Sequence, residues 1–162
     1  MELVAEVDID APAREAWMVL GERFAHIGEW ATPITTSSLQ GEPCVGAVRI
    51  CQIARFGPVA PGTIHERLTA FDPATMSFEY ESIQGMPAFI QRAVNRWSVH
   101  ARGDGLSTVR SHATLELRGP IRLLGFLLAW RMRAGGRRVL DELKHQIEHG
   151  RPHPRKLARL LH

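Results

Sequence analysis

Six short β-rich segments followed by one long helical segment constrain this sequence more than any other feature. Each segment mixes apolar with polar residues, and turns rich in Gly, Pro, Asp and Gln separate them. Short turns between neighbouring strands favour antiparallel pairing. The sequence therefore predicts an antiparallel meander with strands over residues 34–39, 45–55, 63–71, 75–83, 92–102 and 107–117.

The helical segment covers residues 119–149. Its apolar stripe repeats every three or four positions, through Ile121, Leu124, Leu128, Met132, Gly135, Val139, Leu143 and Ile147. This spacing predicts a helix that lies on a core along its whole length. Gly135 and Gly136 together cost about 2 kcal/mol of helix propensity relative to alanine. We therefore expect compensation from close packing, a kink, or space left for a ligand.

The N-terminal part completes the predicted fold. Residues 2–10 alternate like a half-buried strand, and helical spacing follows over residues 13–20, with a second short helix over 23–29. A sheet of about seven strands with one principal helix must curl around that helix, which leaves a space between the two layers. We expect a single α+β domain over residues 1–149 and a basic tail over residues 150–162.

Composition and charge indicate the number of domains, the cellular compartment and the kind of partner to expect. The chain has 162 residues, 44% of them hydrophobic, and two cysteines without a secretory signal before them, so we expect one domain in the cytoplasm. From Arg118 onward it holds 11 of the 20 Lys+Arg but 3 of the 17 Asp+Glu, a net +8 against −5 for the rest. This asymmetry indicates either an anionic membrane partner or simply a solvated basic helix face. Nucleic acid is not expected, because no aromatic residues interleave with the basic ones of the tail.

Four short motifs, in this order, resemble those of a known superfamily: Ala11-Pro12-Ala13-x-x-Ala16-Trp17, Trp30-x-x-Pro33, Val45-Gly46-Ala47-Val48-Arg49 and Glu66-Arg67-Leu68-Thr69-Ala70-Phe71-Asp72-Pro73. They resemble the START/SRPBCC, or helix-grip, superfamily and especially its bacterial polyketide cyclase/dehydrase-like branch. The resemblance covers about residues 2–149 and extends more loosely to plant abscisic-acid receptors and the major birch pollen allergen. It implies a cavity that is opened and closed by loops between strands. The loops at 56–62 and 84–87 lie where the receptors carry their gating and latching loops, although the receptors' own loop residues are missing here.

Glu66 is the first candidate for chemistry. Strand alternation places it on the same face as Ile64 and Leu68, which directs a carboxylate inward. A buried carboxylate is costly unless it is paired or hydrogen-bonded. Glu66 is therefore a candidate general acid/base or ligand anchor. In the alternative, it is a structural carboxylate bonded to Arg49 or to a neighbouring strand. The resemblance adds that the matching glutamate in the hormone receptors contacts ligand through water.

Tyr80, the only tyrosine, is the second catalytic candidate, because its hydroxyl shares the inward face of its strand and is able to orient a carbonyl or protonate an enolate. A core tyrosine is the alternative. The complete candidate pocket has mostly apolar walls; it comprises Trp30, Phe56, Glu66, Tyr80, Met86, Trp97, Leu124, Leu128 and Met132. We expect no cofactor, because the sequence has no phosphate-binding Gly-rich loop. We also expect no metal: His145, His149 and His153 are spaced by four, but Gly150 and Pro152 break the helix before the third, and no acidic or cysteine ligand accompanies them.

The leading interpretation is a protein that binds a small, largely apolar molecule, aromatic, polyketide-like or lipid-like. The first alternative is a cyclase, dehydratase or isomerase that uses Glu66 and Tyr80 on such a substrate. The second is a lipid carrier that docks on anionic membranes through the basic C-terminal region. The sequence is compatible with a monomer or a homodimer.

Overall fold

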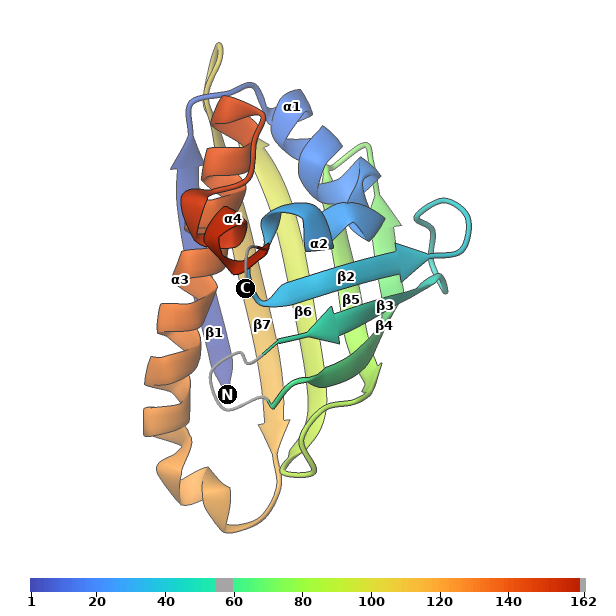
Figure 1. The fold of residues 1–162 in the computed structure, drawn as a ribbon, viewed down its shortest axis with the longest axis vertical. Coiled ribbons are helices and arrows are strands. Elements are labelled where there is room, and N and C mark those ends of the chain that lie inside the picture. Colours follow the sequence, from blue (N-terminus) through green and yellow to red (C-terminus); the bar gives the residue numbers. More distant parts are fainter. Residues whose placement is uncertain (55–59, 161–162) are drawn as a thin grey trace.

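The computed structural model describes residues 1–54 and 60–160, without the side chains at positions 122, 123 and 160. Within these residues, seven strands form one antiparallel sheet in the order β1-β7-β6-β5-β4-β3-β2 (Figure 1). The strands are β1 (Glu2–Ile9), β2 (Ile34–Leu39), β3 (Val48–Ile53), β4 (Gly62–Asp72), β5 (Ser77–Gln84), β6 (Ile90–Ala101) and β7 (Ser107–Leu117). The predicted helix-grip fold, with its curved sheet and long C-terminal helix, is confirmed.

Short helices connect β1 to β2 across one end of the sheet (Figure 1). They are α1 (Ala13–Trp17), a π-helical turn η1 (Met18–Glu22), a 3-10 turn η2 (Phe24–His26) and α2 (Ile27–Trp30). Gly21 lies directly against the ring of Trp17, where an added Cβ would stand 2.5 Å from ring carbons. A larger residue at this position would therefore displace the central tryptophan of the core.

The long helix α3 (Gly125–His149) runs beside β1, and a 3-10 turn η3 (Gly119–Leu124) precedes it (Figure 1). The predicted continuous helix from residue 119 is therefore wrong at its start. Gly119 has a left-handed backbone with φ +74° and Pro120 follows it, so a regular helix begins only at Gly125. The predicted end is confirmed, because Gly150 is the left-handed C-cap residue.

The last helix, α4 (Pro154–Leu160), packs back on the domain. Its Lys156 is 2% exposed, and its Nζ donates to the carbonyl oxygens of Ala31 (3.2 Å) and Ile34 (2.6 Å). On α3, the buried Glu142 carboxylate accepts from the backbone and hydroxyl of Thr32, at 2.8 Å each. These bonds tie α3 and α4 to the segment between α2 and β2, so part of the basic region is structural.

Two apolar clusters hold the helices on the sheet. One joins α1 and the C-terminal half of α3 to the sheet, around Trp17, Phe78 and Leu143. The other joins the N-terminal half of α3 to the sheet, around Leu115 and Ala129. Among the described helices, none is both long enough and apolar enough to cross a bilayer.

Candidate ligand cavity

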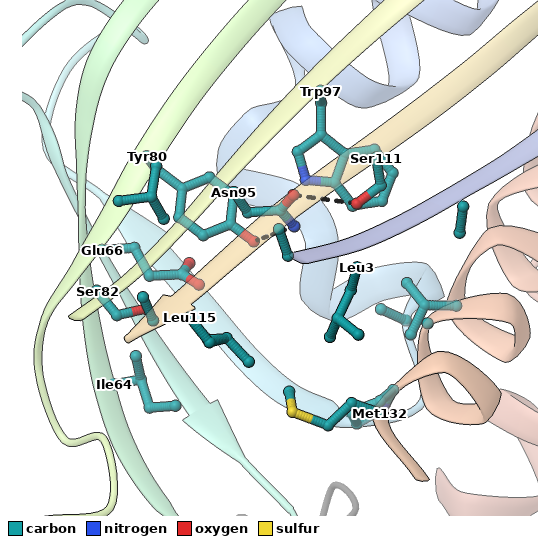
Figure 2. A pocket seen from close by; sticks show the side chains of 18 of the residues that line it. Leu3, Ile64, Glu66, Tyr80, Ser82, Asn95, Trp97, Ser111, Leu115 and Met132 are labelled. Carbon is teal, nitrogen blue, oxygen red and sulfur yellow. Dashed lines mark hydrogen bonds between the residues drawn. The ribbon is translucent and has the colours of Figure 1, made fainter. Parts of the chain in front are cut away.

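A cavity of about 210 Å³ lies between the sheet and α3. Its walls are mostly apolar, with residues of all seven strands on the sheet side and Met132, Gly136 and Val139 on the helix side. Met132 points into this space from α3 (Figure 2). For scale, an engineered apolar cavity of about 150 Å³ in another protein binds benzene. The space is therefore large enough for an aromatic ring with substituents.

Glu66 supplies the one carboxylate on the described lining of this cavity. The β3–β4 register places it directly opposite Arg49, and both side chains are buried. Arg49 Nε and Nη2 both donate to the same carboxylate oxygen, Oε2, at 2.9 and 2.6 Å. All the hydrogen bonds to this carboxylate from described residues end on Oε2, which leaves Oε1 without a partner among them. The carboxylate projects toward the cavity (Figure 2). Oε1 is therefore available as an acceptor for a ligand O–H or N–H.

Arg49 is itself fixed on three sides. Its Nη1 donates to the Phe24 carbonyl at 2.7 Å, and its guanidinium carbon lies 3.7 Å from the centroid of the Phe24 ring. Together with Glu66 these contacts satisfy a buried cation by an ion pair, a carbonyl and an aromatic face. The thiol of Cys51 also donates to Glu66 Oε2, at 3.6 Å, and burial raises the pKa of this thiol to about 11. Cys51 is consequently no nucleophile near neutral pH.

A second polar group crosses the sheet beside Glu66. Asn95 Nδ2 donates to the Tyr80 hydroxyl oxygen at 3.3 Å, and Ser111 Oγ donates to Asn95 Oδ1 at 3.0 Å (Figure 2). Burial, followed by the charge of Glu66, raises the pKa of Tyr80 to about 12. Tyr80 is therefore protonated at neutral pH, and because its oxygen already accepts from Asn95, its proton is free to be donated into the cavity.

Gly136 explains part of the costly glycine pair. It lines the cavity, and a Cβ built on it meets no atom within 4 Å. The sequence predicts that close packing, a kink or space for a ligand compensates for the low helix propensity of the pair, and at Gly136 the structure has open space. Gly85 is different: its φ is +90° and an added Cβ would lie 1.9 Å from the Thr63 carbonyl oxygen. The β5–β6 turn thus lies close on β4, with Met86 at the cavity wall.

The structure brings together five of the nine residues predicted for the pocket: Glu66, Tyr80, Met86, Trp97 and Met132. Three others lie outside the described lining. Trp30 is 3% exposed and packs in the core around a small void with Phe24, Leu124 is half exposed on η3, and Leu128 is buried one turn before Met132. Phe56 falls outside the described residues.

The prediction missed four polar lining residues: Ser82, Asn95, Ser111 and Arg133. The alternation of β6 already carried the signal for Asn95, because it is two residues from Trp97 and must share its face. A polar side chain on an otherwise apolar inward face is the pattern that marks such a residue.

The comparisons with known proteins agree with this architecture. Residues 1–148 match the family model described as "Polyketide cyclase / dehydrase and lipid transport". The chain belongs to this family. A search of curated proteins found no match.

Solved structures with the same fold include proteins of different roles. A START superfamily protein from Mycobacterium smegmatis superimposes with a TM-score of 0.74 at 13% identity, over 91% of this chain and 97% of that one. The Zhui aromatase/cyclase from a Streptomyces species superimposes with a TM-score of 0.70 at 15% identity, over 94% of this chain and 99% of that one. Norcoclaurine synthase from Thalictrum flavum was solved with dopamine and hydroxybenzaldehyde. It superimposes with a TM-score of 0.68 at 14% identity, over 92% of this chain and 87% of that one. At these identities the likeness shows the fold.

Proposed function

We propose that this protein binds a small, largely apolar and preferably aromatic molecule that carries a hydrogen-bond donor at one end and an acceptor nearby. The donor would bond to Glu66 Oε1, and the acceptor would receive the proton of Tyr80. The observation that carries the proposal is the Glu66 carboxylate, which is held by Arg49 through one oxygen and presents the other to an apolar cavity. Apolar walls with a few placed polar groups are what ligand sites need.

The ion pair favours an anchoring role for Glu66. Breaking a buried ion pair is costly, so Arg49 holds the carboxylate in place when no ligand is present. A hydrogen bond to a charged acceptor contributes about 1.5–3 kcal/mol. A ligand hydroxyl on Glu66 should therefore raise affinity by about tenfold or more over the same ligand without it.

The experiment compares 2-naphthol with 2-methoxynaphthalene by isothermal titration calorimetry. The two probes share the ring system, but only the first has a donor for Glu66. The proposal predicts that 2-naphthol binds at least about tenfold more tightly to the wild type, and that Glu66→Gln removes most of this preference. Equal binding of both probes to the wild type would refute the anchor, and this comparison stands alone if the variant does not fold.

The second candidate function is catalysis of an aldol-type cyclisation, dehydration or isomerisation. The family description and the Zhui aromatase/cyclase favour it. In this reading Glu66 removes a proton from a carbon beside a carbonyl, while Tyr80 donates a hydrogen bond to the developing enolate oxygen. Incubation with a poly-β-ketone and product analysis by mass spectrometry distinguishes the two functions. Turnover that survives Glu66→Gln unchanged would rule out Glu66 as the base.

A further inference from the structure

The N-terminal half of α3 carries an exposed apolar patch that the cavity does not use. It consists of Leu124, Phe126, Leu127 and Trp130, which are 50%, 70%, 48% and 70% exposed. Phe126 and Trp130 are one turn apart and share the outward face of the helix, opposite the buried Leu128 and Ala129. Large apolar side chains gathered at this density on a surface indicate a docking site.

The chain segment that carries this patch is rich in arginine, although Glu2 and Glu116 of the sheet line a hollow together with Phe126 and Arg133. Residues 118–140 contain six arginines and no Asp or Glu. Arg131, Arg133, Arg137 and Arg138 are exposed, and none of them forms an ion pair with a described residue. The apolar side chains are therefore flanked by cations that face solvent, an arrangement that fits an anionic surface with an apolar layer beneath it.

We propose that the N-terminal half of α3 docks in the plane of an anionic lipid bilayer. Phe126, Leu127 and Trp130 enter the boundary between headgroups and acyl chains, where tryptophan is favoured, and the arginines contact lipid phosphates. A second copy of the chain fits this surface less well. A two-fold interface would place the patch against itself and so bring two sets of exposed arginines together.

The surface is continuous with the cavity wall. Arg133 is exposed and also lines the cavity, and its neighbour Met132 points into the cavity (Figure 2). A docked protein would thus hold its cavity rim at the bilayer surface, where apolar molecules partition. This passage of ligand rests on the proposed cavity function, whereas docking itself does not.

Fluorescence offers a direct assay, because Trp17, Trp30 and Trp97 are buried and Trp130 alone among the four tryptophans is exposed. The full chain is mixed with vesicles of phosphatidylcholine, or of equal parts phosphatidylcholine and phosphatidylglycerol, with and without brominated acyl chains. We expect a blue shift and bromine quenching with the anionic vesicles, both lost at about 1 M salt, where the Debye length is ~3 Å.

Paired variants separate insertion from net charge. Arg137→Gln with Arg138→Gln should weaken vesicle partitioning by about fivefold per arginine. The matched control, Arg67→Gln with Arg96→Gln, makes the same charge change on exposed strand positions of β4 and β6 and should retain more of the binding. In sedimentation with vesicles, Phe126→Ser with Trp130→Ser should abolish binding that Val45→Ser, at another exposed apolar site, leaves intact.

Several outcomes would overturn the docking proposal. These are no quenching with anionic vesicles at low salt, an equal loss in the control arginine pair, or a dimer in sedimentation velocity that Phe126→Ser with Trp130→Ser dissociates. A variant with a filled cavity, Gly136→Phe, should still bind vesicles. If this variant binds vesicles but no longer binds 2-naphthol, docking does not depend on the cavity. A failure of docking is then distinct from a failure of the cavity function.

Discussion

A larger side chain in place of Gly136 should raise the stability of the protein and, when it fills the cavity, lower its affinity for a ligand. A glycine in a helix interior costs about 1 kcal/mol relative to alanine, and nothing stands where the new Cβ would go. Gly136→Ala should therefore stabilise the protein by about 1 kcal/mol, which raises the Tm of a chain of this size by about 2–4 °C. This variant leaves most of the cavity open.

Gly136→Phe goes further, because a helical side chain at this position points along the cavity toward Met132. Its ring is the size of benzene, which fits a cavity of about 150 Å³, so it would occupy much of the 210 Å³ present. Burial of the ring adds to the gain in propensity, and we expect a net stabilisation of about 1–3 kcal/mol. Affinity for 2-naphthol should fall at least tenfold.

Differential scanning calorimetry and titration of both variants test this prediction. A Gly136→Phe protein that melts below the wild type would show that the space does not exist. A protein that melts higher but binds 2-naphthol as the wild type does would place the ligand elsewhere. Gly136→Ala is the control for the propensity gain alone.

Three further predictions concern the buried polar groups. Arg49→Met leaves the carboxylate of Glu66 buried without its partner and should lower the free energy of unfolding in urea by about 3–5 kcal/mol. Adding Glu66→Leu should recover most of this loss, and a loss below about 1 kcal/mol in the single variant would contradict the buried pair. The raised pKa of Tyr80 stabilises the folded state below the unfolded pKa of about 10, and this stability should disappear as pH rises toward 12; absorbance at 295 nm follows this single tyrosine, and ionisation near pH 10 would refute its burial. Burial, then the charge of His149, lowers the pKa of His145, so stability should fall as pH drops below about 6.5 and should fall less in His145→Gln, by thermal melts at each pH.

Local periodicity is strong enough to predict the strands and the inward direction of Glu66 from the sequence. Alternation fixes the face of each residue and predicts that Glu66, Tyr80 and Trp97 point inward, and all three line the cavity. The sequence also predicts, for a structural Glu66, a bond either to Arg49 or to a neighbouring strand. The β3–β4 register shows that the two alternatives coincide, because Arg49 lies on the neighbouring strand directly opposite Glu66.

The residues that sequence reasoning misplaced depend on longer-range packing. Leu124 belongs to the apolar stripe only if the helix runs straight from residue 119, but the 3-10 turn breaks the helical phase before Gly125. Trp30 lies on a four-residue helix, too short for any periodicity to show its inner face. The extent of empty space around Gly136 is likewise a property of the assembled layers, which a one-dimensional pattern cannot contain.

Methionine-methyl NMR tests the central claim most directly, because the five methionines sample different parts of the fold. Met86 and Met132 line the cavity, whereas Met18 is exposed on η1 and Met76 lies in the turn before β5. Titration of 13C-methyl-labelled protein with 2-naphthol should shift the Met86 and Met132 signals with one common binding curve and leave Met18 in place. Unmoved Met86 and Met132 signals at saturating probe would contradict a ligand site between the sheet and α3.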